Sequence, residues 1–229
     1  MQIIRDSKQL SIVVTRGTIP VSSVDAAYMI DKTTGYIKLN KFTENSYEEF
    51  MQAMENLQKQ GMQSLIYDLR GNGGGFMNEA VDMADEFLDG DKLIVYTAGV
   101  NNKKREYRCK RPGLFEKGKL VLLVDELSAS ASEVLAGALQ DWCRATIIGR
   151  RTFGKGLVQE QYPLSDGSAI RLTVARYYSP LGRSIQRSYE NGKKVYMDEL
   201  WERFNSGELL SADSIRLHTD DKRFMTSCK

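Results

Sequence analysis

The middle of the chain, residues 118–159, constrains the fold more than any other stretch. The apolar run at 120–124 has the length and branching of a buried strand, and a serine cluster follows it, namely Ser128, Ser130 and Ser132. A helical pattern of apolar residues comes next, and a second short strand at 145–148 leads into a glycine-rich turn that holds Lys155. Since parallel strands end at one edge of a sheet, we expect the serines and Lys155 at that edge, where α/β proteins place their sites.

The rest of the chain alternates between strand and helix patterns. We expect a strand at 9–15 and a hairpin of 27–30 and 36–42 that turns at 31–35. A helix should run from Ser46 to about Gln60, where Ser46 and Glu49 form a capping box and Gly61 ends the helix. Further on we expect a strand at 64–69, a helix at 78–88, a strand at 93–97, a basic surface loop or hairpin at 101–119, a hairpin of 158–163 and 169–177, and a short helix at 198–205. This order predicts an α/β layer structure.

Composition excludes several classes of protein. Of the 229 residues 41% are hydrophobic and 27% charged, and the net charge is +2, which gives no general case for nucleic acid or a membrane surface. No stretch has the apolar length of a membrane span, and residues 1–16 lack the pattern of a signal peptide. The single histidine, His218, lies in a polar tail, so multi-histidine metal sites are excluded and a serine nucleophile would more readily use lysine as its base.

The three cysteines give no recognisable framework. Cys109, Cys143 and Cys228 show no CxxC spacing, so neither a zinc site nor a disulfide is implied. We expect ordinary thiols.

Ser130 stands at the start of the helix that follows the serine cluster. A nucleophile in that place gains from the helix dipole, and the next N–H groups can hold an oxyanion. However, Ser130-Ala-Ser-Glu133 is also a capping box, in which the serine simply caps its helix. Spacing alone leaves both interpretations open.

Lys155 lies between Gly154 and Gly156. It can act as a base if burial against the glycines and Phe153 favours its neutral form, and otherwise it is an exposed turn lysine. Residues 149–155 also fit the phosphate-binding pattern GxxxxGK. That motif needs Ser or Thr where this chain has Gly156, and a helix where residues 157–162 read as a strand, so we do not expect a nucleotide site.

Two further features allow two interpretations each. The glycine run at 71–75 follows a buried strand, so its N–H groups can form an oxyanion hole or an anion nest, or the run is a plain tight turn. Asp68 and Arg70 would pair to hold this loop. Asp141, near the end of the helix after Ser130, is either a surface charge or an anchor for a neighbouring Arg or Lys.

Four segments together resemble the carboxyl-terminal processing proteases, also called tail-specific proteases. These are serine endopeptidases with a Ser/Lys dyad. The segments are DLRGNGGG at 68–75, SASASE at 128–133, AGALQD at 136–141 and GRRTFGKGLVQ at 149–159, and the match covers roughly 19–184. The segment RGTIPV at 16–21 resembles the exit from the PDZ domain that such proteases carry before the peptidase core.

The resemblance implies a role for nine residues. Ser130 matches the nucleophile, Lys155 its base, and Gln159 the glutamine that helps to orient the lysine. The backbone N–H groups of Ala131 and of Gly75 or Gly74 would form the oxyanion hole. Three residues match positions that support the site, namely Glu133, Asp141 and Thr152. The family often has proline where this chain has Gly73, which makes the loop freer.

The resemblance also implies a fold and a domain organisation. We expect a ClpP/crotonase-like spiral of ββα units, with a residual PDZ-exit strand and linker at 1–18, the peptidase core at 19–184 and a truncated, polar C-terminal extension at 185–229. The PDZ domain and a later glycine-rich Ile-x-Pro-Asp segment are missing, so we expect a piece of a longer protein exported to the periplasm or cell envelope.

The predicted function is hydrolysis of extended or unfolded polypeptides near their free C-termini through an acyl-enzyme, without metal or cofactor. A homo-oligomer is compatible with the sequence, and no nucleic-acid partner is expected. One alternative is a non-catalytic ligand-binding protein on the same fold, such as the retinoid-binding repeats that resemble these proteases. It should have lost the serine, the lysine or the glutamine, whereas all three remain. A crotonase-type acyl-CoA enzyme lacks support, because DLRGNGGG and TFGKG are protease-type signatures.

Overall fold

The computed structural model describes residues 2–15, 17, 22–211, 224–226 and 228. The expected features at His218 and at 16–21 lie outside these residues. A five-stranded sheet forms the centre of the molecule, in the order β3-β4-β5-β8-β9. Its strands are β3 (Val24–Met29), β4 (Thr34–Leu39), β5 (Ser64–Asp68), β8 (Lys119–Val124) and β9 (Thr146–Gly149). The strands β4, β5, β8 and β9 run parallel, and β3 pairs antiparallel with β4.

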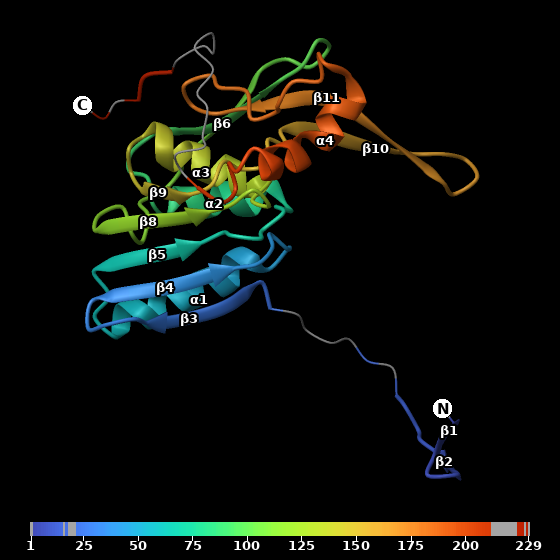
Figure 1. Cartoon of the computed structure of the whole chain (residues 1–229). Helices are drawn as coiled ribbons and strands as arrows, with labels where there is room; N and C mark the ends of the chain where they lie inside the picture. Colours follow the sequence, from blue (N-terminus) through green and yellow to red (C-terminus); the bar gives the residue numbers. More distant parts are fainter. Residues whose placement is uncertain (1, 16, 18–21, 212–223, 227, 229) are drawn as a thin grey trace.

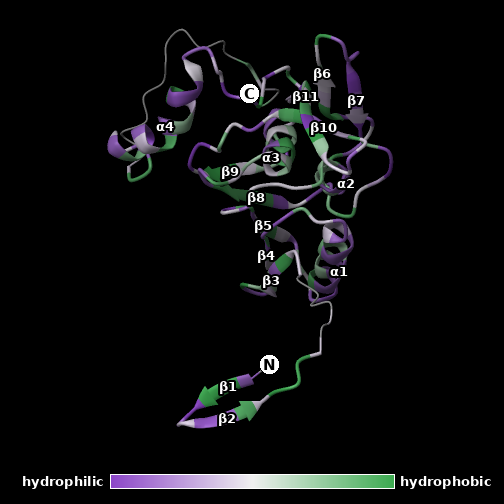
Figure 2. Ribbon diagram, turned by 90° about the vertical axis from the view of Figure 1, so that its right-hand side faces the viewer, coloured by the Kyte–Doolittle hydropathy of each residue, from purple (hydrophilic) through white to green (hydrophobic). Residues whose placement is uncertain are grey.

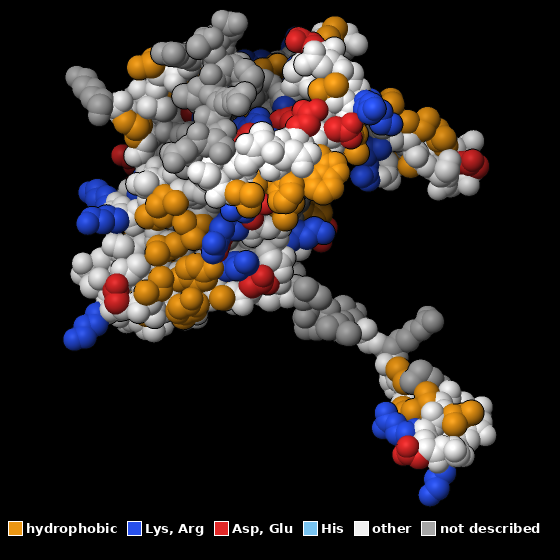
Figure 3. Space-filling view, viewed as in Figure 1, with side chains coloured by type: hydrophobic (Ala, Val, Ile, Leu, Met, Phe, Trp, Pro, Cys, Tyr) orange, Lys and Arg blue, Asp and Glu red, His pale blue; other side chains and the backbone are white. Residues whose placement is uncertain are grey.

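Three helices cover one face of this sheet (Figure 2). They are α1 (Ser46–Lys59), α2 (Met77–Asp85) and α3 (Ala131–Asp141). Side chains alternate along the strands, so Ile37, Leu65, Tyr67 and Leu122 point toward the helices and are buried with the apolar side of α1 and α3. The opposite face of the sheet carries apolar side chains that reach the surface, among them Tyr28 and Ile148 (Figure 3).

A second, antiparallel sheet packs beyond α2 and α3, in the order β10-β11-β6-β7 (Figure 1). Its strands are β6 (Leu93–Ala98), β7 (Arg105–Arg108), β10 (Leu157–Pro163) and β11 (Ala169–Tyr178). The last described helix, α4 (Gly192–Asn205), stands apart from both sheets in Figure 2 and makes hydrogen bonds with Arg151, Gln186 and Arg187. The molecule is therefore mixed α/β, as predicted from the order of the patterns.

The N-terminal strand is shorter than predicted and has a partner. Instead of a strand at 9–15, β2 (Lys8–Ser11) pairs antiparallel with β1 (Gln2–Arg5). This hairpin stands apart from the body (Figure 1). The apolar residues Val13 and Val14 after it are largely exposed, so burial does not extend the strand to them.

The predicted capping box of α1 is wrong. The N-cap is Asn45, and the Ser46 hydroxyl donates to the Thr43 carbonyl oxygen and the Glu79 carboxylate. Glu49 instead accepts hydrogen bonds from the Ser22 hydroxyl and the N–H groups of Ser23 and Val24, so it fixes the entry to β3. Gly61 ends the helix as predicted, with φ +95°.

The cysteine prediction is also wrong. Cys143 and Cys228 form a disulfide across 85 residues of sequence, because the end of the chain returns to the C-terminus of α3. Spacing rules cannot detect a pair that only the tertiary structure brings together. Cys109 is a buried free thiol, and burial raises its pKa to about 12.

Candidate active site

Three of the four segments singled out in the sequence leave the central sheet at the same edge. The glycine run follows the carboxyl end of β5, the serine cluster follows β8, and the Lys155 turn follows β9. The end of β4 joins them, because Phe42 forms a parallel bridge with Gly75. The parallel order of the strands thus brings together residues from Phe42 to Lys155, and it places the serines and the lysine at one edge as the sequence predicted.

The three serines of the cluster have different surroundings. The hydroxyl groups of Ser128 and Ser132 are fully buried and donate to the carbonyl oxygens of Leu69 and Asn72, at 2.8 and 2.9 Å. These two serines therefore fasten the glycine run to the start of α3. Ser130 is only half-buried and takes the rare backbone conformation φ 58°, ψ −113°. A non-glycine residue held there is strained by about 1–3 kcal/mol, a feature that gathers at functional sites.

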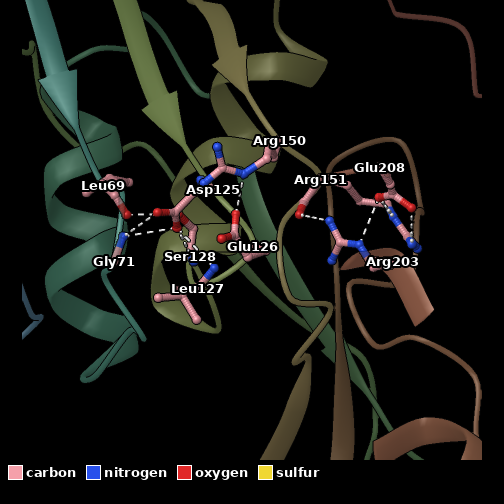
Figure 4. Close-up of polar contacts among 10 residues, drawn as sticks. All are labelled: Leu69, Gly71, Asp125, Glu126, Leu127, Ser128, Arg150, Arg151, Arg203 and Glu208. Carbon is pink, nitrogen blue, oxygen red and sulfur yellow. Dashed lines mark hydrogen bonds and ion pairs between the residues drawn. The ribbon is translucent and has the colours of Figure 1, made fainter. Parts of the chain in front are cut away.

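Asn72 and Asp125 hold the glycine run in place. The Asn72 amide donates to the Leu39 carbonyl oxygen, and its side-chain oxygen accepts the Gly74 N–H at 2.8 Å. The Asp125 carboxylate accepts the N–H groups of Gly71 and Ser128 at 3.0–3.1 Å (Figure 4). Both side chains are buried, and they join the ends of β4, β5 and β8 into one rigid edge.

Two glycines of the run lie where no side chain fits. A Cβ on Gly74 would lie 2.7 Å from the Cβ of Ser130 and 2.9 Å from the Ala131 nitrogen, and one on Gly75 would lie 1.9 Å from the Phe42 carbonyl oxygen. The Gly74 N–H already donates to Asn72. Within the described part of the chain, the N–H groups of Gly75 and Ala131 have no hydrogen-bond partner. They are therefore free to receive a ligand oxygen.

The Glu133 carboxylate connects the serine to the lysine. One of its oxygens accepts the N–H of Ser130 at 2.9 Å and the N–H of Lys155 at 2.8 Å. The other accepts the Thr152 hydroxyl at 2.7 Å and the Gly154 N–H at 2.6 Å. Ser130 and Glu133 form the capping box that the sequence predicted, so Ser130 is the N-cap of α3 whatever its chemistry. The same carboxylate fixes the backbone of both candidate dyad residues.

Of the two interpretations of Lys155, the structure shows the exposed turn residue. Only its backbone is enclosed. Gly156 donates its N–H to the Gln186 side chain at 3.0 Å, and its carbonyl oxygen accepts the Tyr177 N–H at 2.8 Å. The turn continues directly into strand β10, so the phosphate-binding alternative lacks the helix that it requires.

Gln159 lies in β10 opposite Thr173, one position after a β-bulge, and is exposed. Among the hydrogen bonds of the described residues, none joins its side chain to Ser130 or Lys155. A bulge alters the direction of the side chains that follow it, and bulges are frequent beside active sites.

Asp141 acts as an anchor and is not a surface charge. It is 1% exposed and accepts hydrogen bonds from the Arg183 guanidinium and the Leu181 N–H. These contacts fix the turn after β11 against the end of α3. The carboxylate thus lies at the far end of the helix that begins at Ser130.

Asp68 and Arg70 pair as predicted, and Tyr36 joins them. The Arg70 guanidinium and the Tyr36 hydroxyl donate to the Asp68 carboxylate at 2.6–3.1 Å. Burial acts to raise the pKa of Asp68, but these hydrogen bonds outweigh it and hold the pKa below its ordinary value. Burial, followed by the nearby Asp68 charge, raises the pKa of Tyr36 to about 12.

Sequence reasoning missed Asn72, Asp125 and Gln186, whose partners come from distant segments. The available signal was weak: Asp125 directly follows a buried strand, and Asn72 interrupts a glycine run. In the described residues no group of three or more His, Cys, Asp and Glu side chains could hold a metal ion. None of the described helices combines the length and apolar character that a bilayer span needs.

Comparisons with known proteins agree on a family. Residues 33–192 match the model of peptidase family S41. A carboxyl-terminal-processing protease of Synechocystis is 41% identical over 177 residues, which cover 76% of this chain and 41% of that protein. The chloroplastic carboxyl-terminal-processing peptidase 3 of Arabidopsis thaliana is 44% identical over 147 residues, covering 64% of this chain and 28% of that protein.

A solved structure gives the same result. The photosystem II D1 C-terminal processing protease matches with a TM-score of 0.62 and 38% identity, covering 78% of this chain and 48% of that one. The chain spans less than half the length of these curated relatives.

Proposed function

Because the chain belongs to peptidase family S41, we propose that it is a serine endopeptidase that cleaves extended or unfolded polypeptides near their C-termini through a Ser130–Lys155 dyad. The observation that carries this proposal is the shared Glu133 oxygen, which binds the N–H groups of both residues. The two hydrogen bonds meet at one oxygen, so the backbone nitrogens of Ser130 and Lys155 lie close together. The strained conformation of Ser130 supports its assignment as the nucleophile.

In the proposed reaction the Ser130 oxygen attacks the scissile carbonyl carbon and passes its proton to the Lys155 amine. The carbon–nitrogen bond then breaks, the leaving amine takes that proton, and an acyl-serine remains. Lys155 next removes a proton from water, whose oxygen attacks the ester carbon. The bond from that carbon to the Ser130 oxygen then breaks, and the Ser130 oxygen takes the proton from Lys155 as the carboxylic acid product leaves. A bound polypeptide would cover the exposed Lys155 and exclude water from the site.

The oxyanion of each tetrahedral intermediate would lie between two backbone donors. We assign these to Ala131 and Gly75, since the Gly74 N–H is already used by Asn72. The dipole of α3 adds a partial positive charge at the same place. Glu133 and Thr152 would hold the dyad backbone, Asp141 would hold the far end of α3, and Gln159 would orient Lys155.

Strand β10 and the disulfide bear on the substrate and the location of the protein. Strand β10 is an edge strand that begins two residues after Lys155, so an extended polypeptide can pair with it beside the site. The disulfide supports a periplasmic or envelope location, because such bonds persist in oxidising compartments.

The test compares cleavage of an unfolded protein by the chain, by Ser130→Ala and by Lys155→Ala. We expect the parent to cleave and each variant to lose at least about a thousandfold in rate. Cleavage by both variants at the parental rate would refute the dyad. An inactive parent, with ligand binding retained, would favour the non-catalytic alternative.

A further inference from the structure

A short segment outside the expected peptidase core touches the Lys155 turn. Residues 185–187, which we call the strap, follow the turn after β11 and run along residues 154–156. The Arg187 N–H donates to the Gly154 carbonyl oxygen at 3.1 Å, and the Gln186 side chain accepts the Gly156 N–H at 3.0 Å. The strap therefore holds the peptide groups on both sides of Lys155.

The fit between strap and turn is close. A Cβ on Gly156 would lie 2.5 Å from the Gln186 nitrogen and 2.8 Å from the Ile185 Cβ. Gly154 lies directly against the Arg187 side chain, with 3.1 Å between a built Cβ and the Arg187 Cβ. Glycines on both sides of the lysine allow the strap to lie this close to the turn. The GKG sequence therefore serves strap packing as well as turn formation.

The strap is itself fixed from the outside by α4. The Arg187 guanidinium lies between two rings, 4.5 Å from the centre of Phe153 and 3.9 Å from that of Tyr196, and it donates to Glu199 at 2.7 Å. The buried Gln186 amide donates to the Arg187 carbonyl oxygen and to the Tyr196 hydroxyl. Gln186 thus has a defined orientation, with its oxygen directed at Gly156.

We propose that Gln186 is a positioning residue for Lys155, and that the strap and α4 form part of the catalytic unit. The inference rests on the proposed Ser130–Lys155 dyad. Lys155 is exposed, and among the described residues no hydrogen bond joins its side chain to Gln159. Before a substrate binds, the peptide groups beside the lysine therefore set the direction of its side chain. Proton transfer is sensitive to small displacements of the base, so a loose turn should slow the chemical step and leave substrate binding unchanged.

The experiment measures kcat and KM for an unfolded protein substrate. Gln186→Met removes the acceptor for Gly156 while keeping the side-chain volume, and Gln186→Glu keeps an acceptor oxygen. We expect kcat to fall about tenfold in the methionine variant with KM within about twofold of the parent, and the glutamate variant to recover most of the loss. A matched control is Gln58→Met, which breaks a similar bond to the Leu114 carbonyl oxygen far from the site and should leave kcat unchanged.

The inference is overturned if Gln186→Met keeps the parental kcat, or if it changes only KM. If Gln186→Met does not fold, Tyr196→Phe is used in its place, because it removes the hydroxyl that holds the Gln186 amide. A fall in kcat of about twofold or more in Tyr196→Phe supports the inference, and an unchanged kcat overturns it.

Amide hydrogen exchange separates this inference from the proposed function, because it needs no substrate. Peptides covering 152–158 should exchange faster in Gln186→Met, while those covering 125–140 should not. If Gln186→Met exchanges faster but the parent cleaves nothing, the Ser130–Lys155 dyad is refuted and the contact between the strap and the lysine turn is supported. If the parent cleaves but exchange in Gln186→Met is unchanged, the positioning role of Gln186 is refuted.

Discussion

Around Ser130 the anchoring side chains belong to the core, whereas the Lys155 turn is held at the periphery, where the buried Gln186 lies among side chains that reach the surface. We call residues 68–75 and 125–133 the serine side, and residues 150–159 with the strap the lysine side. On the serine side Asn72, Ser128 and Ser132 are fully buried, and their hydrogen bonds run to the ends of β4 and β5 and to the glycine run itself. On the lysine side Lys155, Arg151 and Gln159 are exposed, and the contacts come from a peripheral helix.

Because of this difference, we expect changes on the two sides to affect stability and activity unequally. The serine side belongs to the core, so a change there should lower the free energy of unfolding together with activity. The lysine side is held by α4 and the turn after it, through the pairs of Arg151 with Glu199 and Glu208, which are partly in water and contribute little to stability. A change there should affect the reaction more than the fold. Glu133 belongs to both sides.

The largest expected effect comes from Gly74→Ala on the serine side. The glycine has φ +92°, and a Cβ would overlap the Ala129 carbonyl oxygen at 2.5 Å as well as Ser130. We expect a loss of about 3–5 kcal/mol in the free energy of unfolding, measured by urea denaturation, since neither backbone can move away.

Gly73→Ala is the matched control, because it lies in the same loop with nothing within 4 Å of its built Cβ and without a positive φ. It should change the unfolding free energy by less than about 0.5 kcal/mol. Equal losses in the two variants would show that the loop relaxes, and the serine side would then not be rigid.

The second prediction concerns Glu133→Gln, which keeps the volume but turns an acceptor oxygen into an NH₂ donor. Two of the four groups that Glu133 binds would then face a donor. We expect a loss of about 2 kcal/mol in unfolding free energy and of at least about tenfold in cleavage rate.

Glu79→Gln provides the comparison for Glu133, because Glu79 accepts hydrogen bonds from the Ser46 hydroxyl and the Tyr47 N–H away from the site. It should cost less stability than Glu133→Gln, because both donors use one Glu79 oxygen and glutamine keeps one oxygen, and the cleavage rate should be unchanged. If both variants lose activity in proportion to stability, Glu133 has only a structural role.

The two sides also differ in how far the sequence could predict them. Buried strands and their common edge follow from apolar runs and the parallel order, and Ser130 at the start of α3 follows from its spacing. The surroundings of Lys155 could not be predicted, because Gln186 contacts Gly156 across 30 positions and no periodicity records that contact. The same holds for the Cys143–Cys228 disulfide. Glu49 shows the limit for local rules as well: a capping-box pattern was present, but Ser22 and Ser23 offered it better donors.

The smallest expected effect is a pH dependence that belongs to the serine side. The pKa of Asp68 is lower in the folded protein than the value of about 3.9 in an unfolded chain, so its contribution is present above about pH 4 and is lost as the pH falls below that value. Between pH 5 and pH 3 the parent should lose about 1 kcal/mol more unfolding free energy than Asp68→Asn, measured by urea denaturation at both pH values. Tyr36→Phe removes one of the donors to Asp68 and should remove part of this difference. If the parent and Asp68→Asn respond equally to acid, Asp68 does not anchor the glycine run, and the rigidity of the serine side must then rest on the uncharged contacts of Asn72, Ser128 and Ser132, which do not titrate.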